Sequence, residues 1–215
     1  MAGRWALQHR IRMQVEEEPL QPQHERKDLL RWAGLTCLLV ALDQVSKLIV
    51  RSTLAPGSSI PLLGDILSVT FIPNYRGFSW FVPVLPEWVE PPFLLLRLLI
   101  FVMAFPVYEF YKRSGRATGW AWVALIGISG GTLGNILDDL FMPYTTDFIQ
   151  VFHSPSANLA DLWSFVGVLA LLVEVTLRWR RTRPRLQGFR YSWMKATQAR
   201  REFFGFLLHY LGRKL

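Results

Sequence analysis

The sequence has few of the residues that form disulfides and metal sites. It contains one cysteine, Cys37, and four histidines among 215 residues. A single cysteine excludes a disulfide within the chain, and its position in an apolar stretch favours packing over a zinc site. Only His153 lies away from the two ends of the chain. We therefore predict no metal and no cofactor.

Positive charge is nearly absent from the chain outside three clusters. Of 24 Lys and Arg residues, six lie in 1–31, three in 112–116 and eleven in 178–215. The stretches between these clusters are apolar, the whole chain is 51% hydrophobic, and its mean hydropathy is +0.23. Separate clusters between apolar runs do not form the continuous basic face that binds nucleic acid, so they indicate a membrane protein.

Four apolar segments are long enough to cross a membrane. A transmembrane helix needs about 20 mostly apolar residues to span a hydrocarbon core of about 30 Å. The segments are 29–50, 92–111, 118–140 and 159–179. The predicted fold class is an all-α membrane protein with four transmembrane helices.

The basic clusters predict how the four helices are oriented. They lie before the first segment, between the second and third, and after the fourth, and Lys and Arg favour the cytoplasmic side. Both termini are therefore predicted to be cytoplasmic, with 51–91 and 141–158 outside. The loop 141–158 agrees, since it has no Lys or Arg.

Three further regions complete the predicted organisation. Residues 1–28 lack the apolar core of a secretory signal and are predicted to be a polar cytoplasmic extension of the four-span domain, 29–179. The outer stretch 65–74, "DILSVTFIPN", alternates and is β-branched, which predicts a short strand or hairpin. The tail, 180–215, mixes arginine with aromatic residues and predicts an amphipathic helix attracted by anionic lipid on the inner leaflet.

Polar residues from five segments converge on the outer end of these helices. They are Asp43, Lys47, Asn74, Asn135, Asp138, Asp139, Asp147, Asn158 and Asp161. Such residues often only mark helix ends, but Asp43 and Lys47 lie four apart within an apolar run, which predicts an ion pair. The small residues of "SGGTLGN", 129–135, predict close helix packing that brings Asn135 toward its neighbours.

Two carboxylates on adjoining outer segments suit an aspartic peptidase. Amide hydrolysis needs a base that activates water and an acid that polarises the carbonyl, and two aspartates sharing one proton supply both. Nucleophilic catalysis is disfavoured, because the outer serines lack a convincing histidine or lysine partner. The residues alone do not rank Asp147 and Asp161 above Asp138 and Asp139.

Five motifs in order, between about 30 and 179, resemble those of the lipoprotein signal peptidases, or signal peptidase II. "DQVSK", 43–47, is similar to D-Q-x-x-K, and "IPNYRGFSWF", 72–81, to an outer asparagine-plus-glycine motif. "GGTLGNILDD", 130–139, resembles G-G-x-x-G-N-x-x-D-R. "TDFIQV", 146–151, resembles V-D-F-I, and "ANLADLWSFVG", 157–167, resembles F-N-x-A-D. Each motif is weak alone, whereas the ordered set is specific.

The resemblance implies a membrane aspartic endopeptidase of the bacterial cytoplasmic (inner) membrane, with its active site near the outer face. It would remove signal peptides from lipidated prolipoproteins by cleaving before the diacylglyceryl cysteine, without a metal. The catalytic pair would be Asp147 and Asp161. The supporting or substrate-binding residues would be Asp43, Lys47, Asn74, Gly77, Gly130, Gly134, Asn135, Asp138, Asn158 and Ala160.

Some positions depart from the family pattern. Asp139 stands where the family has arginine, Ala157 replaces a phenylalanine, the asparagine motif has an altered spacing, and the connection from Asp147 to Asp161 is short. Arg97, inside the second span, is a candidate compensating charge. These departures leave open a noncatalytic relative that binds lipidated or membrane-embedded peptides. A small transporter is disfavoured, because no charged path continues toward the inner half of the helices.

Overall fold

The computed structural model describes residues 22–75, 90–113, 115, 117–152, 154–181 and 189–212. The chain divides into two compact units, Met1–Gly34 and Leu35–Leu215. In the first unit the described residues form the start of helix α2, Pro22–Thr53. All other described elements belong to the second unit. The predicted site residue Gly77 and most of the predicted extension, 1–28, lie outside the described residues.

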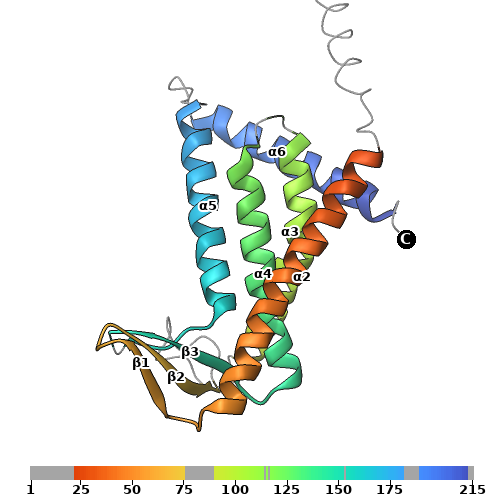
Figure 1. Cartoon of the computed structure of the whole chain (residues 1–215). Helices are drawn as coiled ribbons and strands as arrows, with labels where there is room; N and C mark the ends of the chain where they lie inside the picture. The colour runs from red at the N-terminus through yellow and green to blue at the C-terminus, as the bar shows by residue number, and fades with distance from the viewer. Residues whose placement is uncertain are drawn as a thin grey trace, which may run out of the picture. The chain divides into compact units, whose positions relative to one another are not determined.

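Four long helices confirm the four predicted membrane spans (Figure 1). They are α2, α3 (Glu90–Arg113), α4 (Gly119–Phe141) and α5 (Leu159–Arg181). The parts apolar and long enough to cross a membrane are Glu25–Thr53, Leu94–Arg113, Gly119–Phe141 and Leu159–Arg180. Helix α2 begins before the predicted residue 29, because a helix can continue into polar sequence beyond the hydrocarbon.

Glycines let helix α4 pack very closely against α5. A Cβ atom on Gly131 would lie 2.2 Å from the backbone oxygen of Ala160, and one on Gly127 would lie 2.7 Å from that of Trp163. On α5, a Cβ atom on Gly167 would lie 2.6 Å from the backbone nitrogen of Ile128. The small residues predicted to bring helices together therefore do so, and α4 is the most buried span.

A three-stranded antiparallel sheet lies at one end of the helices, which we call the sheet end. Its order is β1 (Ser59–Leu63), β2 (Leu67–Asn74), β3 (Thr145–Val151). Strand β2 lies within 65–74, where a strand was predicted, whereas strand β3 lies in the outer loop 141–158, for which no strand was predicted. This short segment is strand because β2 supplies its ladder, with Ile72 opposite Asp147.

A small core fastens the sheet to α2. Val50 near the end of α2, Phe71 of β2 and Phe148 of β3 are all buried and form one cluster. Since β3 lies between α4 and α5 in the chain, this core fixes where both helices approach α2. At the other end of the chain, the predicted tail helix is present as α6, Phe189–Gly212.

The close packing of α4 on α5 generates a stability prediction. Gly131→Ala should lower the free energy of unfolding by about 1–3 kcal/mol, the usual cost of overpacking, because its Cβ meets backbone that cannot move alone. Thermal unfolding in detergent measures this. Gly34→Ala is the matched control, since its Cβ meets nothing within 4 Å and the change should be neutral or stabilising. Equal stability of the two variants would contradict the packing argument.

Candidate functional site

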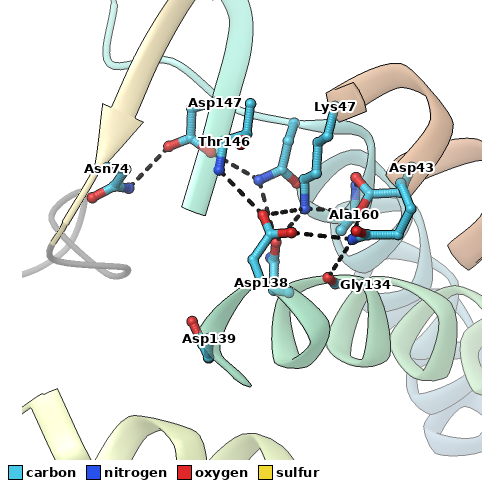
Figure 2. A network of polar contacts seen from close by, with 12 residues as sticks. Asp43, Lys47, Asn74, Gly134, Asp138, Asp139, Thr146, Asp147 and Ala160 are labelled. Atoms are coloured by element: carbon cyan, nitrogen blue, oxygen red, sulfur yellow. Dashed lines mark hydrogen bonds and ion pairs between the residues drawn. The ribbon is translucent and has the colours of Figure 1, made fainter. Parts of the chain in front are cut away.

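The polar residues predicted to converge, apart from Asp139, lie together at the sheet end of the helices (Figure 2). Helices α2 and α4, the start of α5, and strands β2 and β3 each contribute side chains to one connected network. The register of β2 with β3 and the close contact of α4 with α5 bring these five elements to one place. No metal ligand set of three or more His, Cys, Asp or Glu occurs within the described part of the chain.

The centre of the network is the ammonium group of Lys47. Its Nζ atom lies 2.7 Å from Asp43 Oδ2 and 2.9 Å from Asp138 Oδ2. The side chains of Lys47 and Asp43 are 0% exposed, so the pair predicted from their spacing exists and is fully buried. Buried charges are tolerated only when paired and hydrogen-bonded, which makes the three groups depend on one another.

The two carboxylates beside Lys47 also accept backbone N–H groups from the next elements. Asp43 Oδ1 accepts from the amide of Ala160 at 2.8 Å, at the start of α5. Asp138 Oδ2 accepts from the amide of Thr146 at 3.1 Å, in β3. Ala160 directly precedes Asp161 and Thr146 directly precedes Asp147. The ion network therefore holds the backbone just before each of the two candidate aspartates.

Two asparagines connect Lys47 to the candidate aspartates. Asn135 Oδ1 accepts from Lys47 Nζ at 3.2 Å, and its Nδ2 donates to Asp161 Oδ1 at 2.9 Å. Asn158 Nδ2 donates to Asn135 Oδ1 at 3.2 Å and to Asp147 Oδ1 at 2.8 Å. Both aspartates are thus bonded to asparagine side chains that are bonded to each other.

Each candidate aspartate has a further partner that orients it. Asp161 Oδ2 accepts from the backbone N–H of Asn158 at 3.2 Å, while Asn158 Oδ1 accepts from that of Asp161 at 3.0 Å. This reciprocal pair caps the start of α5. Asp147 Oδ2 accepts from Asn74 Nδ2 at 2.9 Å, so β2 positions the carboxylate carried by β3.

Asp147 has an environment that favours its neutral form. The residue is 3% exposed, and this burial raises the pKa of the Asp147 carboxyl to about 7, with the negative charge of Asp161 as the second cause. The hydrogen bonds from Asn74 and Asn158, and then the charge of Lys47, act in the lowering direction. Because Asp161 contributes to the shift, the two carboxyl groups are close enough to interact electrostatically.

Asp139 points away from this network. It forms an ion pair with Arg97, which joins α3 to α4, and Figure 2 shows it apart from the connected residues. Arg97 itself is buried. Asp139, which departs from the family pattern, is therefore paired with Arg97, the residue that was predicted from the sequence as a compensating charge.

Most of the predicted catalytic and supporting residues meet here, and Gly130 and Gly77 are the exceptions. Gly134 contributes its backbone oxygen as an acceptor, whereas Gly130 lies against Leu39 of α2 and serves helix packing. Gly77 lies outside the described residues. Thus Gly130 is near the site in sequence but is not among the bonded groups.

Sequence reasoning missed two members of the network, Gln44 and Thr146. Gln44 Nε2 is shared among Asp43 Oδ2, Gly134 O and Asp138 Oδ1 at 3.1, 3.0 and 3.2 Å. Gln44 lies inside the quoted motif "DQVSK", but its position next to Asp43 gave no reason to expect that its amide would contact three different groups. Thr146 donates its backbone N–H to Asp138 and accepts a bond from Arg51 through its hydroxyl. A contribution made through the backbone leaves no signal in residue type.

Comparison with known proteins identifies relatives of this chain. The profile of a family described as signal peptidase (SPase) II matches residues 35–177. The lipoprotein signal peptidase of Pseudomonas paraeruginosa is 28% identical over 159 residues, which cover 72% of this chain and 92% of that protein. That of Pseudomonas syringae pv. tomato is 30% identical over 151 residues, covering 68% and 86% respectively.

Solved structures share the fold. Two that are described as bacterial membrane enzymes match with TM-scores of 0.56 and 0.53, at 22% and 24% identity. They cover 74% and 67% of this chain, and 94% and 92% of their own. With the family profile spanning all four helices of the site, the chain belongs to the signal peptidase (SPase) II family and is a multi-pass membrane protease.

Proposed function

We propose that this protease is an aspartic endopeptidase that cleaves lipidated prolipoproteins before the diacylglyceryl cysteine. The observation that carries the proposal is the pair Asp147 and Asp161. Asp147 is buried with a raised pKa to which the charge of Asp161 contributes, and both carboxylates are held by asparagine amides. Two carboxyl groups that share one proton are the acid and base that amide hydrolysis requires.

The raised pKa of Asp147 supports a division of roles between the two aspartates. Near neutral pH its carboxyl carries the proton for a large fraction of the time, so it acts as the acid that donates to the scissile carbonyl oxygen. Asp161 is then the base that takes a proton from the attacking water, whose oxygen bonds to the carbonyl carbon. When the tetrahedral intermediate collapses, the C–N bond breaks, the proton held by Asp161 passes to the leaving amine, and one hydroxyl of the intermediate returns its proton to Asp147 as the C=O bond forms again.

The position of the pair suits a substrate anchored in the bilayer. The aspartates lie at the sheet end, where apolar spans give way to a sheet. A diacylglyceryl group held in the hydrocarbon would present the adjacent peptide bond at this level. Because the basic clusters lie at the opposite ends of the spans, we place the sheet end at the outer face of the bacterial cytoplasmic membrane.

The first test removes either carboxylate. Asp147→Asn and Asp161→Asn should each lower kcat by about 10²–10⁴-fold, because one lacks the acid and the other the base. Cleavage of a purified lipidated precursor, followed as a shortened product on a gel, measures this. Asp65→Asn is the control, since Asp65 is exposed in the β1–β2 turn. Cleavage that survives either change would overturn the assignment, and no cleavage by the unchanged protein would favour a noncatalytic peptide-binding relative.

The second test is the pH dependence of kcat/KM. Activity should fall as pH rises through about 7, because Asp147 then loses the proton it must donate. Asn74→Leu removes a hydrogen bond that stabilises the ionised form, so the pKa of Asp147 should rise and the alkaline limb should move to higher pH. Ser68→Ala on the same strand should leave the limb in place, since the Ser68 hydroxyl contacts only Thr70 among the bonds described. A limb that moves to lower pH in Asn74→Leu would contradict this role.

The third test concerns Arg97 and Asp139. Arg97→Leu leaves the Asp139 carboxylate without this cation in a largely buried position, so we expect a loss of about 3–5 kcal/mol and of activity. Adding Asp139→Asn removes the uncompensated charge and should restore much of the stability. Thermal unfolding of the two single variants and the double variant forms a complete cycle. A fully stable and active Arg97→Leu protein would show that the pair is dispensable.

A further inference from the structure

Helix α6 packs one of its faces on the end of span α3. The rings of Phe203 and Phe206 lie 5.2 and 5.6 Å from that of Phe110, centroid to centroid. The guanidinium of Arg113 stands 4.5 Å from the centre of the Phe206 ring. Since Phe110 and Arg113 lie in the last turn of α3, this face of α6 packs against α3.

A second apolar stripe lies about 150° around the helix from that packed face and is open. Phe204 is 61% exposed and Leu208 is 74% exposed, and their spacing of four places them on one side of the helix. At about 100° per residue, they point about 100° and 140° away from Phe203. Arg200 and Arg201 are exposed at about 60° and 160°, one on each border of the stripe.

The packing of α6 also sets its depth relative to the bilayer. The membrane-crossing part of α3 is Leu94–Arg113, so the contacts with Phe110 and Arg113 lie where that span ends. In Figure 1, α6 runs across this end of the helices, far from the sheet. The open stripe is therefore at the level where hydrocarbon meets the lipid headgroups.

We propose that α6 lies along the membrane surface at the end opposite the sheet, with Phe204 and Leu208 inserted into lipid and Arg200 and Arg201 against anionic headgroups. Residues 178–215 carry eleven Lys and Arg and a single acidic residue, Glu202, so the charge complements an anionic surface. Glu202 and His209 are exposed on the opposite side of the helix, as an interfacial helix requires. The proposal does not depend on the peptidase chemistry.

The depth of individual positions tests insertion. In a Cys37→Ser background, spin labels on Phe204→Cys and Leu208→Cys are compared with labels on Glu202→Cys and His209→Cys in proteoliposomes of phosphatidylcholine and phosphatidylglycerol. The ratio of collision rates with oxygen and with a water-soluble nickel complex should be several-fold higher at 204 and 208. Equal ratios at all four positions would overturn the proposal. Spin–spin broadening confined to 204 and 208 would also overturn it, because it would show a second copy of the chain covering the stripe.

A charge variant tests the anionic part separately. Arg201→Gln should reduce the oxygen-to-nickel ratio of the label at 208 in vesicles containing phosphatidylglycerol and leave it unchanged in pure phosphatidylcholine. Glu202→Gln, on the opposite side, is the control and should not reduce the ratio in either lipid. Equal effects of Arg201→Gln in both lipids would overturn the headgroup contact. Circular dichroism confirms that each variant keeps its helix content.

Discussion

The ammonium group of Lys47, held between the carboxylates of Asp43 and Asp138, is the interaction on which the site depends. All three side chains are buried, so removing Lys47 would leave two buried carboxylates without their cation, and removing either carboxylate would leave Lys47 with one anionic partner. The carboxylate of Asp43 also accepts a hydrogen bond from the backbone N–H of Ala160, and that of Asp138 accepts one from the backbone N–H of Thr146. One ion cluster therefore positions the backbone just before Asp161, in a helix, and just before Asp147, in a strand.

The consecutive residues Asp138 and Asp139 of α4 contact different partners, because a helix turns about 100° per residue. Asp138 faces Lys47, whereas Asp139 faces α3 and pairs with Arg97. This separation explains how the chain carries a carboxylate at a position where the family pattern has arginine without adding its charge to the Lys47 cluster. The Arg97–Asp139 ion pair joins α3 to α4.

The sequence predicted features that depend on local pattern and missed those that depend on tertiary contact. Span length and apolar content located the four helices, alternation located β2, and the spacing of Asp43 and Lys47 predicted their pair. Strand β3 was missed because only its ladder with β2 makes it a strand. Gln44 and Thr146 were missed because their contacts join distant elements, in one case through a backbone N–H. The roles of Asp147 and Asp161 came from the family resemblance and remain proposals.

The balance of the Lys47 cluster also bears on the proton at Asp147. A lone buried cation near this carboxyl would favour its ionised form and lower its pKa. Lys47 has that effect, but it is the smallest of the causes acting on Asp147, after burial, the charge of Asp161 and two amide hydrogen bonds. The carboxylates of Asp43 and Asp138 lie 2.7 and 2.9 Å from Lys47 Nζ, and their negative charge offsets the positive charge of Lys47. The cluster can therefore hold both aspartates in position without removing the proton that an acid catalyst must keep.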